Sequence, residues 1–389
     1  MTRRLYHDDA YLRRFDAEVV AITAYKARPA VVLDRTAFYP EAGGQLGDRG
    51  RLGDLAVVDT QETDDGTIVH LVDPAAEPPA VGSRVTGELD WLRRRQHMAQ
   101  HTAQHLLSGA LLDRAQAPTA SARLGESALT IDVARDRIPE AEIAAAEDLA
   151  NDLVDDDLPI RAWFPSAEEL AGLKLRRDPK VTADIRVVAI GEFDLSPCGG
   201  THCARTSQLA AVRITGAERY KGMTRVTFTT ARRGRAELFA RDQVLRGLAS
   251  QFSCGPVEVP AAIDKLRRDV EAAGTELTQL RSRLASTIIA QLPGDGPVVA
   301  ALPVDAELLR SIAAKLAGGG RDAILCAPDD GGAHVVVMRA AGSSLDCSAL
   351  WKRLAGKLGG RGGGRADRAE GRITTPIADW PAAVADATG

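Results

Sequence analysis

The sequence predicts a multidomain α+β protein, because its residue pattern changes three times along the chain. Up to about residue 90, short apolar runs are separated by Gly, Pro and Asp, which is typical of a small β-barrel or sandwich. A mixed region follows, and then a helical region in which apolar residues alternate by four and three. After a Pro- and Gly-rich linker at 293–297, short strands alternate with helices. These changes divide the chain into residues 1–91, 92–235, 236–292 and 293–389.

Four short strands are expected in the first region, at Ala17–Ile22, Ala30–Leu33, Leu55–Val58 and Thr67–Val72. A glycine-rich segment, Phe38–Gly50, lies between the second and the third. Its glycines indicate tight turns or a close approach of backbone. The segment either contacts a ligand or only turns the chain.

The central region is expected to mix helices and strands. The predicted helices are 92–116 and Pro139–Leu153, and the predicted strands are Ser127–Val133, Ile185–Ile190, Ala211–Ile214 and Thr224–Thr229. The apolar pattern of residues 236–292 predicts a helical hairpin or short coiled coil, and the alternative is an amphipathic helix that packs on a core. The last region predicts an α/β unit with a glycine-rich loop at 359–365, which either wraps a phosphate or forms a flexible turn.

Two motifs supply donors for a metal ion. His101 and His105 are four positions apart in the predicted helix and therefore share one of its faces. Cys198 and His202 have the same spacing but enclose two glycines, which favours a loop. Three imidazoles and one thiolate make a tetrahedral Zn2+ shell. The chain has only 7 histidines, so chance placement of three in these motifs is the weaker explanation. His97, four residues before His101, has the spacing to replace one of the pair.

The composition restricts the class of protein. No run of about 18 apolar residues is present, so a membrane span is not expected. The N-terminus lacks the apolar region of a secretory signal, and five scattered cysteines suit a reducing, cytoplasmic setting. The net charge of −4 argues against binding nucleic acid through overall charge. Three local basic clusters flank the two motifs; each alone suits a solvated face, and together they favour a polyanionic substrate.

These residues resemble a known family, the long form of the free-standing alanyl-tRNA editing proteins (AlaX), which are related to the editing half of alanyl-tRNA synthetase. Thr36–Gln45 resembles the glycine-rich motif of the family's N-terminal barrel, and residues 359–366 resemble part of its C-terminal DHH-associated domain. The two metal motifs resemble the family's ligand motifs, which implies His101, His105, Cys198 and His202 as Zn2+ ligands. Two segments, 206–210 and 365–371, depart from the family pattern.

The resemblance implies a zinc-dependent deacylase that hydrolyses the ester of serine, with glycine as a second candidate, on mischarged alanine tRNA. It implies that Thr119 and Ser121, at alternate positions of a strand, recognise the serine hydroxyl. The further candidates are Glu41 as a general base, with Asp48 as its alternative, and Gly43, Gly44, Gln45 and Arg123 as substrate-binding residues. The zinc either activates water or orients the substrate.

Two other functional classes remain open. The first is a non-catalytic, zinc-stabilised tRNA-binding module, which a closed four-ligand shell would suit. The second is a fragment of a synthetase that charges tRNA, although no aminoacylation domain is evident. The helical region or the C-terminal region is the candidate contact for a homodimer.

Overall fold

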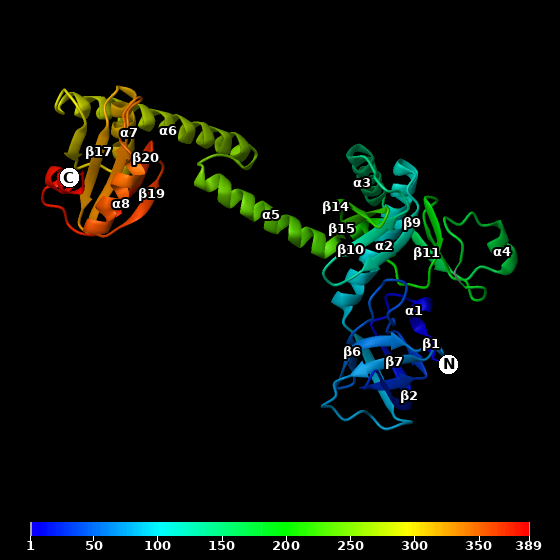
Figure 1. Cartoon of the computed structure of the whole chain (residues 1–389). Coiled ribbons are helices and arrows are strands. Elements are labelled where there is room, and N and C mark those ends of the chain that lie inside the picture. The colour runs from blue at the N-terminus through cyan, green and yellow to red at the C-terminus, as the bar shows by residue number, and fades with distance from the viewer. Residues whose placement is uncertain (1, 180, 389) are drawn as a thin grey trace. The chain divides into compact units, whose positions relative to one another are not determined.

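The computed structural model describes residues 2–179 and 181–388 and divides into two compact units, Met1–Leu245 and Arg246–Gly389 (Figure 1). The predicted multidomain α+β architecture is confirmed, and so is a β-barrel. The division into four domains at the predicted bounds stays a prediction. No described helix is both long and apolar enough to cross a membrane.

The first unit opens with a closed barrel of strand order β2-β3-β7-β6-β5-β8. A short parallel pair, β1 (Arg3–Arg4) with β4 (Arg35–Thr36), and helix α1 (Leu5–Asp8) lie beside it. The barrel encloses an apolar core that includes Val19, Leu33, Phe38 and Val57. The barrel strands are β2 (Arg14–Tyr25), β3 (Arg28–Leu33), β5 (Gly50–Leu52), β6 (Leu55–Glu62), β7 (Ile68–Val72) and β8 (Arg84–Leu89).

Helix α2 (Trp91–Ala115) follows the barrel directly and is buried on almost every side. The Asp90 side chain caps it by accepting a hydrogen bond from the backbone N–H of Arg93 at 3.0 Å. Small residues allow neighbours to approach: a Cβ at Gly109 would lie 2.7 Å from the Phe193 ring. The helix runs along a four-stranded sheet of order β14-β15-β10-β9 (Figure 1).

The remaining elements of the first unit surround this helix. They are the sheet strands β9 (Thr119–Leu124), β10 (Leu129–Val133), β14 (Val212–Tyr220) and β15 (Met223–Thr230), the three-stranded sheet β11 (Ile160–Trp163), β12 (Val187–Ile190) and β13 (Asp194–Pro197), the helices α3 (Glu140–Asp155) and α4 (Ala167–Gly172), and the 3-10 turn η1 (Thr206–Leu209). Helix α5 (Ala231–Gln251) follows β15.

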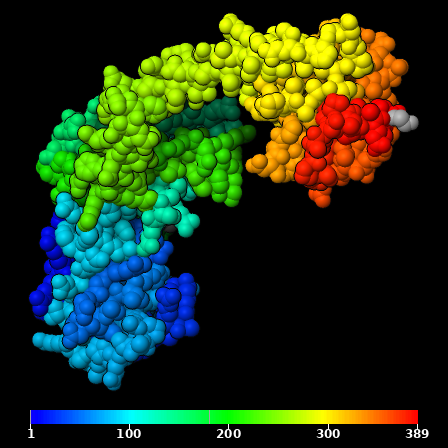
Figure 2. Space-filling view, turned by 90° about the vertical axis from the view of Figure 1, so that its left-hand side faces the viewer, coloured from blue at the N-terminus to red at the C-terminus, as the bar shows by residue number. Residues whose placement is uncertain are grey.

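The second unit contains the long helix α6 (Val259–Ala290), preceded by the short 3-10 turn η2 (Pro256–Glu258). The predicted apolar seam of α6 is largely exposed at Leu266, Val270 and Leu277, and only the C-terminal end of the helix packs on α7. The α/β part has sheet order β16-β17-β18-β20-β19. Its elements are β16 (Val298–Ala301), α7 (Ala306–Gly318), β17 (Ala323–Asp329), β18 (Gly332–Met338), α8 (Cys347–Leu358), β19 (Gly360–Gly364), β20 (Arg368–Ile373) and α9 (Trp380–Thr388). Figure 2 shows the C-terminal segment, in red, on the outside of this unit.

The prediction of a glycine-rich loop at 359–365 is wrong. Residues Gly360–Gly364 form the edge strand β19, which pairs with β20. The glycines make room for the Trp351 ring, because a Cβ at Gly371 would lie 2.1 Å from it and a Cβ at Gly362 would lie 2.9 Å from it. The strand therefore depends on a tertiary contact that local sequence does not show.

A buried ion pair joins the barrel to α2. Arg94 and Asp48 have side chains exposed by 0% and 1%, and the Nε atom of Arg94 donates to Oδ2 of Asp48 at 2.8 Å. The guanidinium also donates to the carbonyls of Ala10 and Ala37, and the backbone N–H of Tyr39 donates to Asp48. Asp48, a candidate base from the sequence, is thus bound to Arg94.

We expect Arg94→Ala to lower the free energy of unfolding of the first unit by about 3–5 kcal/mol, because it leaves the Asp48 charge buried and unpaired. The neighbouring Arg95→Ala is the control, since Arg95 is exposed on the same helix and should change stability by less than about 0.5 kcal/mol. Urea unfolding followed by circular dichroism measures both. Equal effects of the two substitutions would contradict a structural role for the pair.

Candidate metal centre and adjoining cavity

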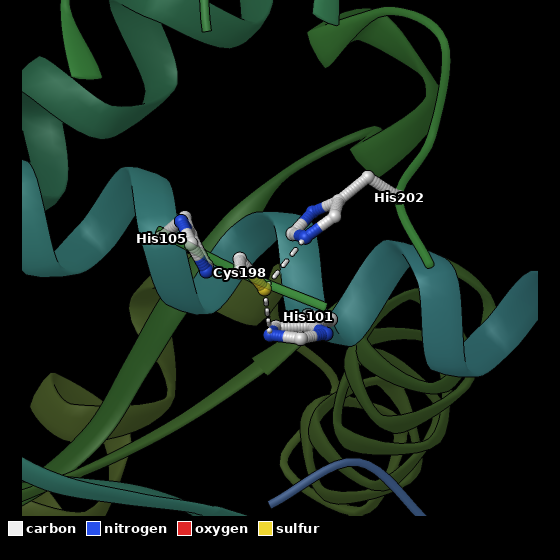
Figure 3. A group of neighbouring side chains, drawn as sticks. All are labelled: His101, His105, Cys198 and His202. Atoms are coloured by element: carbon white, nitrogen blue, oxygen red, sulfur yellow. Dashed lines mark hydrogen bonds between the residues drawn. The ribbon is translucent and has the colours of Figure 1, made fainter. Parts of the chain in front are cut away.

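Four side chains from two segments converge in the first unit (Figure 3). His101 and His105 lie on consecutive turns of α2, whereas Cys198 and His202 lie in the loop that follows β13. One ligand atom from each residue lies within 4.8 Å of the others. The Cys198 Sγ atom is 3.4 Å from Nε2 of His101 and 3.4 Å from Nε2 of His202. A tetrahedral zinc shell has ligand atoms roughly 3.5 Å apart, so the group could hold a metal ion.

The three histidines are held by their other ring nitrogens. Nδ1 of His101 is 2.8 Å from Oε1 of Gln45, and Nδ1 of His105 is 3.3 Å from Oδ2 of Asp194. Nδ1 of His202 is 3.2 Å from the Thr102 hydroxyl. Partners at Nδ1 fix the orientation of each ring and leave Nε2 toward the cluster, which is the arrangement that metal-binding histidines have.

The electrostatic environment favours a thiolate at Cys198. Burial of the thiol acts to raise its pKa, but His101, His105 and His202 together hold the pKa well below its usual value. The thiolate is the form of cysteine that binds metal. Burial acts to raise the pKa of Asp194, but its hydrogen bond to His105 and the nearby Arg176 lower that pKa to about 2. Asp194 therefore stays a carboxylate beside His105.

Gln45 connects the glycine-rich segment to this cluster. Its Oε1 atom also accepts from the backbone N–H of Thr201 at 3.2 Å, and its Nε2 donates to the Thr201 hydroxyl at 2.8 Å. Gly44 makes the approach possible: its φ is +89°, and a Cβ there would lie 2.8 Å from the carbonyl oxygen of Ala122. The segment thus packs against β9 and places Gln45 between His101 and the Cys198–His202 loop.

A cavity of about 1030 Å3 adjoins the cluster. His101 and Cys198 line it, and so do Thr119, Ser121, Gly43 and Gly44 among the residues predicted from sequence. The hydroxyl of Ser121 donates to Asp132 at 3.0 Å, whereas the buried hydroxyl of Thr119 has no hydrogen-bond partner among the described residues.

Other predicted residues lie outside the cavity lining. Glu41 is exposed and accepts a hydrogen bond from Gln61 at 2.9 Å, and Arg123 is an exposed residue of β9. His97 is buried one turn before His101 and outside the group of four, with its pKa lowered to about 4 by burial. Cys203 is buried in the apolar core, where burial raises its pKa to about 12.

The hydrogen-bond partners that orient the histidines were not predicted from the sequence. Asp194 is four residues before Cys198, and Thr102 adjoins His101, but neither spacing matches a known ligand motif. The same holds for Arg4, Tyr6 and Arg186, which line the cavity from segments far apart in the chain. Their contribution depends on tertiary contacts.

Comparisons with known proteins point to one group. A family model described as the threonyl and alanyl tRNA synthetase second additional domain matches residues 185–227, and a model for class II (A) tRNA synthetases matches residues 10–93. The alanyl-tRNA editing protein AlaX-L of Pyrococcus horikoshii is 30% identical over 391 residues, which cover 96% of this chain and 95% of that protein.

Two alanine–tRNA ligases match a similar share of the chain. The ligase of Thermococcus kodakarensis is 32% identical and that of Pyrobaculum neutrophilum 33% identical, each over 97% of this chain. The chain spans only 42% and 43% of their lengths. A solved structure, the C-Ala domain of Aquifex aeolicus alanyl-tRNA synthetase, is 23% identical and covers 22% of this chain and 81% of its own, with a TM-score of 0.21.

We expect Gly200→Ala to weaken metal binding by about tenfold or more, because its Cβ would lie 2.2 Å from Cε1 of His101 and displace that ring. Gly199→Ala is the matched control, since a Cβ there meets nothing within 4 Å. Titration with Zn2+ against a chromophoric chelator measures both affinities. If both variants bind Zn2+ as the parent protein does, His101 is not a ligand.

Proposed function

Because the chain belongs to the family of alanyl-tRNA editing proteins that includes AlaX-L, we propose that it is a trans-editing deacylase of mischarged alanine tRNA. Its substrate is the ester of serine, with glycine as the second candidate, at the terminal adenosine of the tRNA. The reaction takes place at a zinc ion held by His101, His105, Cys198 and His202.

One observation favours catalysis over a purely structural metal site. Two of the four donor residues, His101 and Cys198, line a cavity that also contains the strand residues Thr119 and Ser121. A structural zinc site is closed and needs no cavity beside its ligands. The arrangement therefore supports an enzyme rather than a zinc-stabilised binding module.

In this proposal, the zinc ion would act on the ester, and the protein's own residues would position the ion and the substrate. When bound, zinc supplies Lewis-acid chemistry toward the ester. Asp194, Gln45 and Thr102 keep the three imidazoles in place, and the glycine-rich segment brings its backbone to the cavity at Gly43 and Gly44. Glu41 as a general base and Arg123 as a substrate contact stay predictions.

Thr119 is the better candidate for recognising the serine hydroxyl. Its own hydroxyl is unpaired within the described residues, whereas that of Ser121 is bonded to Asp132, which in turn pairs with Arg225. A substrate hydroxyl would give Thr119 the missing hydrogen bond. Alanine has no hydroxyl and would leave Thr119 without this hydrogen bond, so the site should hydrolyse correctly charged tRNA slowly.

The proposed function predicts rapid deacylation of serine-charged alanine tRNA by the purified protein, with glycine released more slowly. Alanine should be released at least about a hundredfold more slowly than serine, because it lacks the hydroxyl that the site recognises. Release of radiolabelled amino acid from each charged tRNA measures the three rates. Binding of zinc and tRNA without release of any amino acid would instead support the binding-module alternative.

We expect Thr119→Val to lower kcat/KM for serine-charged tRNA by about 5- to 100-fold, because valine has a similar shape but cannot form the hydrogen bond. The rate with glycine-charged tRNA should stay the same, which separates recognition from damage to the fold. Ser121→Ala is the matched control on the same strand. A loss confined to Ser121→Ala would transfer the role to that residue.

A further inference from the structure

Arg186 is a buried cation without an acidic partner. It is 7% exposed and lines the cavity, yet no carboxylate of the described residues lies within ion-pair distance of it. Arg94, which is also buried, is neutralised by Asp48, and the partly buried Arg176 is neutralised by Asp194. An unpaired buried charge is costly, and a protein that keeps one at a cavity wall commonly uses it for an anionic ligand.

The contacts of Arg186 satisfy only part of its guanidinium. Nη1 donates to the carbonyl oxygens of Cys198 at 3.0 Å and of Gly200 at 2.8 Å. The Nε atom is buried without a hydrogen-bond partner among the described residues. Of the groups whose charge acts on Arg186, the Cys198 thiolate has the largest effect, and a divalent ion bound there would more than offset that charge.

The cavity lining also contains further hydrogen-bond donors, together with the acids Glu62, Asp178 and Asp184. Tyr6 is 1% exposed, and its hydroxyl also lacks a hydrogen-bond partner within the described part of the chain. His7 is kept neutral: burial, together with the charges of Arg186 and Arg4, lowers its pKa to about 4. Arg4 is already paired with Glu62. The aspartates of the cavity lining, Asp178 and Asp184, do not pair with Arg186.

We propose that Arg186 binds the phosphate group on the 5′ side of the terminal adenosine of the substrate. The inference rests on the proposed function, which places the ester of that adenosine at the metal cluster. The two carbonyl contacts hold Arg186 beside Cys198, and in the substrate only the ribose separates this phosphate from the ester. A guanidinium forms strong charge-assisted hydrogen bonds with phosphate oxygens, which would give Arg186 the anionic partner that it lacks.

The test compares binding of adenosine 5′-monophosphate and of adenosine to the zinc-loaded protein by isothermal titration calorimetry. The parent protein should bind the monophosphate about tenfold or more tightly, and Arg186→Gln should bind both ligands alike with unchanged affinity for adenosine. Arg51→Gln removes an equal charge from the exposed surface of the barrel and should keep the preference.

Three results would overturn the inference. They are an equal affinity of the parent protein for both ligands, a preference that survives in Arg186→Gln, and an equal loss of affinity for both ligands in that variant. If Arg186→Gln does not fold, Arg186→Lys retains the charge and should keep part of the preference; its complete loss in a folded, zinc-loaded Arg186→Lys would contradict the proposal. A preference for the monophosphate without deacylation would contradict the proposed function alone, and deacylation without the preference would contradict only the role of Arg186.

Discussion

The site depends on the hydrogen bonds that Gln45 makes with His101 and Thr201. These bonds join three separate segments: the glycine-rich segment of the barrel, helix α2 and the Cys198–His202 loop. A fully buried amide that bridges such segments must have all its partners in place, because an unsatisfied polar group in the interior is costly. The buried pair of Arg94 and Asp48 acts in the same region and fixes the start of α2 against the barrel. The arrangement of the four donor residues, the shape of the cavity and the fold are therefore coupled.

Much of the site could be predicted because its donors come in pairs with short spacing. Helix periodicity alone places His101 and His105 on one face, and glycines around Cys198 indicate a loop. The partners of the histidines could not be predicted, since Asp194 and Thr102 become relevant only after β13 and α2 are packed together. The glycine-rich strand β19 was mistaken for a loop because glycine normally weakens strands. The glycines are needed there because the Trp351 ring packs against the backbone, which is also a tertiary contact.

The charge distribution explains how a chain with a net charge of −4 can accept a polyanion. Many of the described arginines lie in ion pairs with acids and the net charge is negative, so overall charge contributes little attraction. Arg186 differs from these arginines because its Nη1 atom donates to two backbone carbonyls beside the four donor residues, while its Nε atom has no partner among the described residues. Recognition of the substrate would thus come from a local, desolvated charge, where electrostatic interactions are strong, rather than from a basic surface.

The most direct test is to remove the metal and return it while hydrolysis of serine-charged alanine tRNA is followed in a single turnover. We expect hydrolysis to stop in the metal-free protein and to return with about one equivalent of Zn2+, while Cys198→Ala stays inactive at the same Zn2+ concentration. Full hydrolysis by protein that is verified to be free of metal would show that a metal ion at the four-residue centre does not perform the chemistry.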